Sequence, residues 1–348
     1  MIKILHSADW HLGAPLLRHD ALKDMLMQIP ERVVALCKQE KCDLLLLSGD
    51  LFDSTYHADA LRAVRSALEK LEIPVFISPG NHDFVAPGSP WLADIWPENV
   101  HIFTHPAMES VDVKALDCCV YGAGYISMDC APLLADFTPT HTEKYAVGVL
   151  HGDPTQINSP YCPITAEQVS QSGLNYLALG HIHKADSFRA GNTLCAWPGC
   201  PMGRGYDETG DKGVLIVTVD DTTTARFVSL GLPRFHDLAV DVSVSLDTVL
   251  PPVGNEDYYR ITLTGVGEKP DLAALQQAYS RFPNLVLRDK TTAPIDIWSS
   301  AGEDTLEGKY FHLLQTALEN SDETAQKRIR LAAEISRKLL DGQEVVLP

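Results

Sequence analysis

Apolar runs and amphipathic segments alternate over the first hundred residues of the chain. The short apolar runs predict buried strands and comprise residues 2–7, 43–48, 74–78 and 100–103. The intervening segments 21–39 and 58–71 repeat apolar positions with helical spacing, the first interrupted at Pro30. Strands separated by helices are joined by right-handed crossovers into a mostly parallel sheet with covered faces. Functional side chains in such sheets gather in loops after the carboxyl ends of the strands.

Further along the chain the helical segments disappear. Additional strands are predicted at residues 118–121, 146–150 and 176–179. From residue 186 to about 230 only short apolar runs follow, which favours hairpins and an antiparallel second sheet. The predicted fold class is therefore α/β, with two sheets and outer helices in a four-layer α/β/β/α sandwich.

The pattern restarts after Gly231-Leu232-Pro233. A small α/β unit is predicted from strands at 238–244, 258–264 and 285–287 and a helix at 271–281. Residues 305–340 repeat apolar positions with helical spacing. We therefore predict three parts: a main domain over 1–231, a small domain over 232–300 and a helical segment over 301–348.

Composition places the chain among ordinary globular proteins. It has 348 residues, more than one domain core usually holds, with 45% hydrophobic and 21% charged residues. No apolar stretch approaches the roughly 18 to 20 residues of a membrane helix. Asp9 interrupts the N-terminus too early for a secretion signal, so a cytoplasmic location is expected. The eight cysteines form no C-x-x-C pair, which predicts reduced thiols that fill apolar positions.

Net charge limits the partners of the chain. The formal charge is −18, whereas binding to nucleic acid is driven by lysine and arginine side chains that displace counterions from phosphates. The chain alone should therefore bind DNA weakly. Any role on DNA requires local positive charge, bound metal or a partner protein.

Five clusters of polar residues each follow a predicted strand. They are Asp9-Trp10-His11, Gly49-Asp50, Gly80-Asn81-His82-Asp83, His151-Gly152-Asp153 and Gly180-His181-Ile182-His183. Because each cluster lies where a strand gives way to a loop, we expect them to converge at one edge of the sheet.

The residue types in these clusters suit divalent cations. Carboxylate, imidazole and amide oxygen ligands favour manganese, iron or zinc over softer metals. Two such ions about 3.5 to 4 Å apart can hold the attacking and leaving oxygens of a phosphoryl transfer. Two cations at that distance repel each other unless an anion lies between them. Asp50, next to Gly49, is the predicted bridging carboxylate.

The order of these motifs resembles a known superfamily. D-x-H, G-D, G-N-H-D, H and G-H-x-H follow one another as in the calcineurin-like metallophosphoesterases. The longer strings His6-Ser7-Ala8-Asp9-Trp10-His11-Leu12-Gly13 and Ser48-Gly49-Asp50-Leu51-Phe52-Asp53 resemble the SbcD/YhaO-type DNA repair exonuclease family. The resemblance covers about residues 1–230, and the five motifs in order are highly specific.

The resemblance implies a role for each residue. One metal ion would be held by Asp9, His11 and His183, the other by Asn81, His151 and His181, with Asp50 shared by both. The implied cofactors are two divalent ions, Mn²⁺ or alternatively Fe²⁺ or Zn²⁺, whose bridging hydroxide attacks phosphorus.

Other residues near the motifs keep more than one interpretation. His82 is expected to be the general acid or a stabiliser of negative charge, with orientation of a metal ligand as the alternative. Arg204 is either a substrate phosphate contact or an ordinary surface arginine. Asp53 stands where archaeal and eukaryotic relatives carry a histidine, so that histidine's role does not transfer. Asp83 is expected to hold a loop amide or His82.

The resemblance also bears on substrate and partners. Protein phosphatases of the superfamily carry one arginine soon after G-D and another just before G-N-H; here Leu51 to Asp53 and Pro79 occupy those places. In SbcD-like proteins a small capping domain helps to select DNA, and C-terminal helices dock onto an SbcC-like coiled-coil ATPase. Here the helices over 310–340 either dock onto such a partner or pack on the body of the protein. The partners to consider are DNA, that ATPase and a second copy of the chain.

Three functions remain in view. The first is a DNA exonuclease or endonuclease in DNA repair. The second is a phosphodiesterase for small molecules or cyclic nucleotides, which needs a pocket but no basic surface. The third is a non-enzymatic scaffold stabilised by metal. The complete set of ligand residues and His82 argue against the third.

Overall fold

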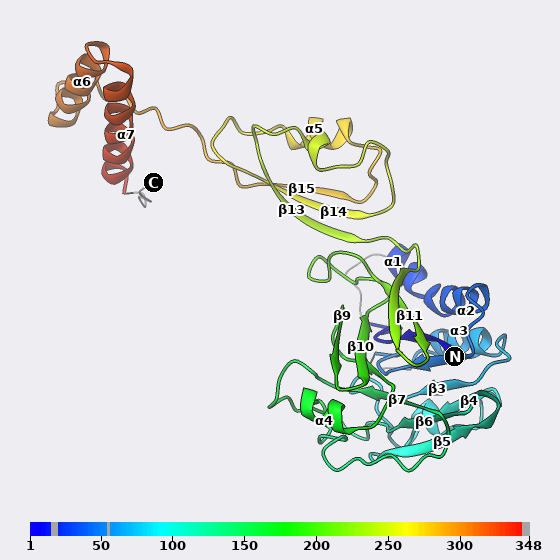
Figure 1. Cartoon of the computed structure of the whole chain (residues 1–348). Helices are drawn as coiled ribbons and strands as arrows, with labels where there is room; N and C mark the ends of the chain where they lie inside the picture. Colours follow the sequence, from blue (N-terminus) through cyan, green and yellow to red (C-terminus); the bar gives the residue numbers. More distant parts are fainter. Residues whose placement is uncertain (15–19, 54–55, 343–348) are drawn as a thin grey trace. The chain divides into compact units, whose positions relative to one another are not determined.

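A computed structural model describes residues 1–14, 20–53 and 56–342 and places the strands in three sheets. The chain divides into two units. The first contains Met1–Asp237 and Glu256–Tyr259, and the second contains Leu238–Asn255 and Arg260–Pro348. The first unit holds both large sheets (Figure 1).

The first sheet has six strands in the order β12-β11-β1-β2-β3-β4. Their bounds are β1 (Ile2–Ser7), β2 (Leu44–Leu47), β3 (Val75–Ile77), β4 (Val100–Ile102), β11 (Gly213–Val219) and β12 (Thr224–Ser229). Strands β1 to β4 run parallel, and β11 pairs antiparallel with β1. The parallel strands therefore all end at the same edge.

Three helices follow the first strands: α1 (Asp20–Leu26), α2 (Ile29–Gln39) and α3 (Ala58–Leu68). The predicted break in the helical segment is present, but it lies before Ile29, between α1 and α2. Pro30 itself occupies the first turn of α2, where its missing N–H has no helical partner to lose.

The second sheet has the order β5-β6-β7-β8-β10-β9. Its strands are β5 (Glu109–Val113), β6 (Cys118–Gly122), β7 (Tyr145–His151), β8 (Tyr176–Gly180), β9 (Lys184–Ala190) and β10 (Thr193–Gly199). The four central strands run parallel and the two edge strands antiparallel. Helix α4 (Ala166–Gln171) and the polar edge strands β5 and β9 carry too few apolar residues to have been predicted.

The predicted antiparallel second sheet over residues 186 to about 230 was wrong. Strands over 118–179 belong to the second sheet, while β11 and β12 join the first. The apolar pattern shows which faces of a strand are buried but not which neighbour supplies its hydrogen bonds.

Side chains of the strands alternate between separate cores. Ile4, Leu46 and Val147 lie in the core between the two sheets, together with other residues of β1, β2 and β7. Leu45 on the opposite face of β2 packs with residues of α2 and α3, and Leu150 on the opposite face of β7 packs near α4. The fold is thus the predicted four-layer α/β/β/α sandwich, with helices outside each sheet (Figure 1).

The cysteines take part in this packing. All eight are free, and all but Cys130 are buried. This agrees with their predicted role as reduced, space-filling side chains.

The second unit contains a three-stranded sheet and the C-terminal helices. Strands β13 (Phe235–Asp241), β14 (Tyr258–Thr264) and β15 (Leu285–Asp289) pair in that order, with helix α5 (Leu272–Ala278) between the last two in sequence. Helices α6 (Leu306–Glu319) and α7 (Glu323–Leu340) follow. Each begins at a side-chain cap, Thr305 for α6 and Asp322 for α7. Across the described ranges, no helix combines the length and apolar character that a membrane span requires.

Candidate metal centre

The predicted ligands lie at the ends of strands from both sheets. Asp9, Asp50 and Asn81 follow β1, β2 and β3 of the first sheet, whereas His151 and His181 end or follow β7 and β8 of the second. The prediction of a single sheet edge was therefore wrong. Because the two sheets face each other, their carboxyl ends meet and close the site from two sides.

Gly180 permits this close approach of the two sheets. A Cβ at this position would overlap the carbonyl oxygen of Ser48, which follows β2, and would lie 2.9 Å from His151 Nδ1. Any larger residue would force apart the two loops that carry the predicted ligands.

Several predicted ligands have an unusual backbone conformation. Seven described non-glycine residues have positive φ, and four of them are predicted ligands: Asp9, His11, Asp50 and His181. Positive φ costs a non-glycine residue roughly 1 to 3 kcal/mol, and such strain concentrates at functional sites. Backbone hydrogen bonds from Asp9 to Gly49 and from His11 to Asp50, 3.0 and 2.9 Å long, hold two of the strained loops together.

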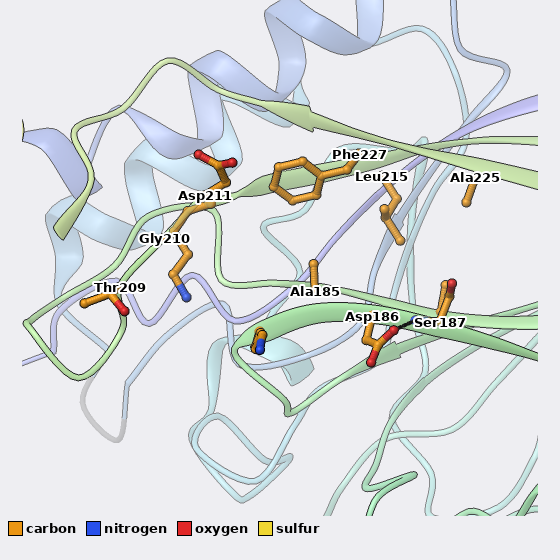
Figure 2. A pocket seen from close by; sticks show the side chains of 12 residues that line it. Ala185, Asp186, Ser187, Thr209, Gly210, Asp211, Leu215, Ala225 and Phe227 are labelled. Carbon is orange, nitrogen blue, oxygen red and sulfur yellow. Dashed lines mark hydrogen bonds between the residues drawn. The ribbon is translucent and has the colours of Figure 1, made fainter. Parts of the chain in front are cut away.

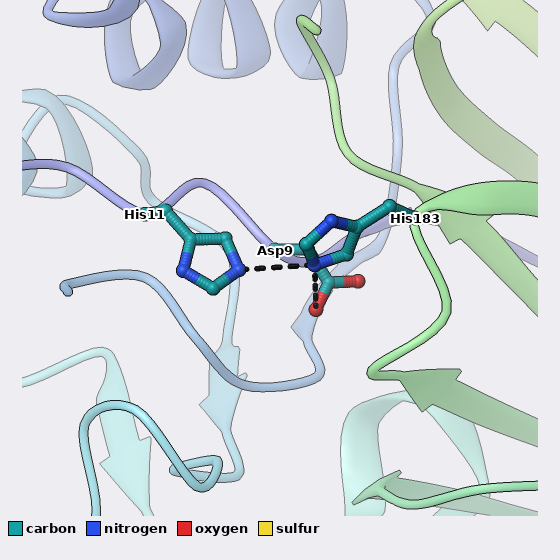
Figure 3. Close-up of side chains that lie close together, drawn as sticks. All are labelled: Asp9, His11 and His183. Carbon is teal, nitrogen blue, oxygen red and sulfur yellow. Dashed lines mark hydrogen bonds and ion pairs between the residues drawn. The ribbon is translucent and has the colours of Figure 1, made fainter. Parts of the chain in front are cut away.

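Asp9, His11 and His183 form one group of potential ligands. Atoms of the three side chains that can bind a metal lie within 4.8 Å of one another (Figure 3). His183 Nε2 is 3.1 Å from His11 Nε2 and 3.9 Å from Asp9 Oδ1. Asp9 and His11 are buried, and His183 is partly exposed.

Asn81, His151 and His181 gather on the other side of Asp50. His151 Nε2 lies 2.9 Å from Asn81 Oδ1, and its ring is 5.2 Å from the ring of His181. His151 Nδ1 donates to the carbonyl oxygen of Ser48, which leaves Nε2 for the site. The backbone N–H of His181 donates to the Asp9 carboxylate, which links this group to the first.

Asp50 lies between the two groups. Its Oδ2 is 3.3 Å from His151 Nε2 and 3.7 Å from His11 Nε2, and the side chain is buried. Its Oδ1 accepts a hydrogen bond from the backbone N–H of His82. Although burial raises the pKa of the Asp50 carboxyl, the neighbouring His151 and His11 rings hold that pKa well below its usual range. The carboxylate is therefore ionised and faces both groups.

His82 lies at the exposed rim of this arrangement. Its side chain is 38% exposed, and its Nδ1 is 2.7 Å from Asp53 Oδ1. The His11 and His82 rings beside Asp53 lower the pKa of its carboxyl to about 2. An ionised Asp53 can only accept, so His82 Nδ1 carries the proton and Nε2 remains for a substrate. Sequence reasoning had assigned no such contact to Asp53.

Comparison with known proteins identifies the family of the chain. Residues 2–185, more than half of the chain, match the family of calcineurin-like phosphoesterases. The chain belongs to the calcineurin-like phosphoesterase family.

A curated relative in this family is the uncharacterized metallophosphoesterase YhaO of Bacillus subtilis (strain 168). It is 31% identical over 265 residues, and the match covers 70% of this chain but 64% of the relative. Two solved structures are also similar to the chain. The protein TT1561 of Thermus thermophilus has a TM-score of 0.42 at 13% identity, covering 65% of this chain and 98% of that one. A dimetal phosphatase from Danio rerio has a TM-score of 0.44 at 10% identity, covering 64% and 98%.

Calcineurin-like phosphoesterases hold divalent metal ions in a binuclear site, and the donor set here fits such ions. His151 Nδ1 donates to Ser48, and once Nε2 loses its proton three acceptors would converge there: Nε2 itself and the oxygens of Asn81 and Asp50. Burial alone lowers the pKa of His151, but Asp50 raises it to about 9. A proton and a divalent cation therefore compete for the same place. His11 Nδ1 is buried, and Asp53 Oδ1 lies 3.9 Å from it, beyond hydrogen-bond distance.

Arg204 lies beside the first group instead of on an open surface. Its side chain is 21% exposed, and Nη2 is 3.0 Å from His183 Nδ1. The residue that brings these two groups together is Glu208, which sequence reasoning missed. Glu208 Oε1 is 2.6 Å from both His183 Nδ1 and Arg204 Nη2. The available signal was an acid four residues after an arginine in a glycine-flanked loop.

Asp83 has a structural role, as expected. Its buried carboxylate accepts hydrogen bonds from the backbone N–H groups of Gly80, Asp50, Leu51 and Phe52. It thereby joins the loop after β3 to the loop after β2. This fixes the position of Asp50 relative to Asn81.

A separate pocket of about 450 Å³ lies along strands β9 to β12. Figure 2 shows Asp186 and Ser187 on one side of it and Asp211 and Phe227 on the other. None of the predicted metal ligands lines this pocket.

Proposed function

We propose that this chain is a two-metal phosphodiesterase that cleaves DNA as an exonuclease or endonuclease in repair. The observation that carries the proposal is the place of Asp50, whose Oδ2 lies within 3.7 Å of imidazole nitrogens from both ligand groups. Such a shared carboxylate suits a pair of cations. A pair of cations suits the in-line displacement at a phosphodiester.

The ligand assignment follows the two groups. Asp9, His11 and His183 would hold one ion, Asn81, His151 and His181 would hold the other, and Asp50 would be shared by both. Nitrogen and oxygen donors without thiolate favour Mn²⁺, with Fe²⁺ and Zn²⁺ as alternatives. When bound, the ions supply an activated water and offset the charge of the phosphate. Membership of the family supports a binuclear site, and the identity of the metal is part of the proposal.

His82 acts on the leaving group. Asp53 holds Nδ1–H and orients the ring, and Nε2, when protonated, can deliver a proton to the leaving oxygen. The 38% exposure of the side chain makes Nε2 accessible to a substrate. The same N–H would also stabilise negative charge on the phosphate before the proton moves.

Arg204 is proposed to bind the substrate phosphate. Its ion pair with Glu208 uses Nε and Nη2, which leaves Nη1 for a ligand. A guanidinium presented in this way recognises a phosphate oxygen with both charge and direction.

DNA is the proposed substrate because the motif strings resemble the SbcD/YhaO-type family. Because the chain has a net charge of −18, binding to DNA then requires positive charge supplied by a partner protein. We propose that α6 and α7 provide the contact to a cytoplasmic partner of the coiled-coil ATPase type. Leu306, Leu313 and Leu339 on these helices are 88, 68 and 63% exposed, and exposed apolar side chains of this kind are available to a protein partner.

The acidic charge also favours an alternative. A phosphodiesterase for small molecules or cyclic nucleotides needs only the metal site and His82. The two functions differ in which phosphodiesters are cleaved.

The test is hydrolysis in Mn²⁺ of three substrates: duplex DNA with free ends, single-stranded DNA and bis-p-nitrophenyl phosphate. Each is assayed with and without an SbcC-like ATPase, and Asp50→Ala serves as the metal-deficient control. DNA cleavage by the wild type but not by the control supports the nuclease. Cleavage of the aryl ester alone, even with the ATPase present, supports the small-molecule enzyme. If the protein binds Mn²⁺, Fe²⁺ or Zn²⁺ but hydrolyses none of the three substrates, the result supports the third function, a non-enzymatic scaffold stabilised by metal.

A further inference from the structure

The loop between β10 and β11 places one carboxylate between the ligand group and the arginine. Glu208 has a side chain that is only 11% exposed. Its Oε1 faces His183 Nδ1, and its Oε2 accepts from the backbone N–H and Nε of Arg204, at 2.8 and 3.2 Å. Both carboxylate oxygens are therefore occupied by groups of the site.

These contacts determine which nitrogen of His183 carries a proton. An ionised carboxylate only accepts hydrogen bonds, so Nδ1 must be the protonated nitrogen. The backbone N–H, Nε and Nη2 of Arg204 all donate to Glu208, as they would to an ionised carboxylate. The unprotonated Nε2 then faces His11 and Asp9 (Figure 3). This is the form of histidine that can bind a metal.

The same carboxylate fixes the arginine. Arg204 Nη2 and His183 Nδ1 are both donors and lie 3.0 Å apart, a contact that is tolerable because Glu208 Oε1 accepts from both. Without Glu208, Arg204 Nη2 could donate to an unprotonated His183 Nδ1, which would leave the ring proton on Nε2, and the guanidinium would lose its anchor. The backbone of His183 is held separately, because Lys212 Nζ donates to its carbonyl oxygen at 2.8 Å.

We propose that Glu208 is a positioning residue that sets the tautomer of His183 for metal binding and aims Arg204 at the substrate phosphate. The inference rests on the proposed function, in which His183 is a ligand and Arg204 a phosphate contact. In this role Glu208 would contact neither the metal nor the substrate and would act only through His183 and Arg204. Its loss should therefore affect two measurable properties at once.

The first measurement is calorimetric titration of Mn²⁺ into the metal-free full-length protein. Glu208→Gln should weaken one of two binding events by roughly 10- to 100-fold, the usual effect of losing a carboxylate behind a metal-binding histidine. Asp211→Asn is the matched control, because Asp211 lies in the same loop but pairs with Arg234. The control should bind Mn²⁺ within about twofold of the wild type.

This readout needs no substrate, so it remains informative even if no phosphodiester is cleaved. Unchanged affinity in a folded Glu208→Gln protein would overturn the proposal. If that variant does not fold, Glu208→Asp replaces it. The shorter side chain keeps the charge but draws the carboxylate back from His183, so one binding event should still weaken. Equal affinity in this variant would likewise overturn the proposal.

The second measurement separates the two effects of Glu208. Arg204→Ala should raise KM without weakening Mn²⁺ binding, because it removes a positive charge but no partner needed by His183. Glu208→Gln should raise KM and also weaken Mn²⁺ binding. A Glu208→Gln protein with normal KM at saturating Mn²⁺ would exclude the effect on Arg204.

Discussion

At the scale of single residues, the site depends on polar pairs that join distant parts of the chain. Asp53 faces His82, Glu208 faces His183, and His6 lies in the core behind them. The carboxylate partners of His82 and His183 keep a proton on Nδ1, whereas His6 contacts two hydroxyl groups that can donate or accept. Their chemistry therefore differs although their side chains are identical.

For His82, the expected effect of substitution is on turnover. His82→Ala should retain both metal ions but lose roughly 10²- to 10⁴-fold in kcat, because it removes a proton donor and no ligand. Metal content by mass spectrometry and steady-state kinetics check this. Asp50→Ala is the contrast, since metal and activity should be lost together. Wild-type turnover by His82→Ala would exclude the general-acid role.

For His6, the expectation concerns stability and pH. Its Nδ1 contacts Tyr176 Oη at 2.7 Å, its Nε2 contacts Ser48 Oγ at 2.6 Å, and burial lowers the pKa of His6 from 6.5 to about 3. Between these values the unfolded chain binds a proton that the folded protein does not. The stabilisation from neutral His6 is thus complete above pH 6.5 and is lost as the pH falls.

Chemical denaturation at several pH values measures this contribution. The difference in unfolding free energy between wild type and His6→Asn should shrink by about 1.4 kcal/mol per pH unit from about pH 6 to 4.5. Parallel pH profiles for the two proteins would contradict the burial of a neutral His6.

At the scale of elements, the site depends on how closely the strand ends of the two sheets approach. Asp83 joins the loops after β2 and β3, and Gly180 allows the end of β8 to lie against the loop after β2. These residues contribute no ligand atom from their side chains. They set the spacing of the loops that do.

Gly180→Ala should therefore destabilise the protein and impair metal binding. The added methyl group overlaps the Ser48 carbonyl, and such overpacking costs about 1 to 3 kcal/mol or more. Gly302→Ala is the matched control, because no atom lies within 4 Å of its added Cβ. Thermal unfolding and Mn²⁺ titration of both variants check this. If Gly180→Ala unfolds at the wild-type temperature and binds Mn²⁺ with wild-type affinity, the end of β8 and the loop after β2 lie farther apart than in this structure.

At the scale of the whole molecule, negative charge is the dominant property. The chain carries a formal charge of −18, and Asp9 and Asp50 place two buried carboxylates within one group of potential ligands. Bound cations would offset the charge of these two carboxylates. Metal binding should therefore stabilise the first unit as well as support catalysis.

Metal removal tests this coupling. Mn²⁺ at about 100 times its Kd should stabilise the folded protein by about 2.7 kcal/mol relative to chelator-treated protein, because it binds the folded state preferentially. Differential scanning calorimetry should show a higher Tm with metal for the wild type and a much smaller shift for Asp50→Ala. Equal Tm values with and without metal would argue against a preformed cation site.

The sequence by itself determined most elements and the positions of the polar clusters. Strands β1 and β14 occupy the predicted residues, because apolar spacing reflects which side chains are buried. The five motifs follow β1, β2, β3, β7 and β8, since strand ends can be located from the same pattern.

Only the tertiary structure decided which strands are neighbours and which polar groups meet. The pairing of β1 with β11, more than 200 residues later, uses backbone hydrogen bonds that carry no side-chain signature. The contact of Glu208 with His183 spans 25 residues between separate loops and depends on where the backbone places both. Local patterns record burial, whereas convergence of two sheets at one metal site is a property of the packed molecule.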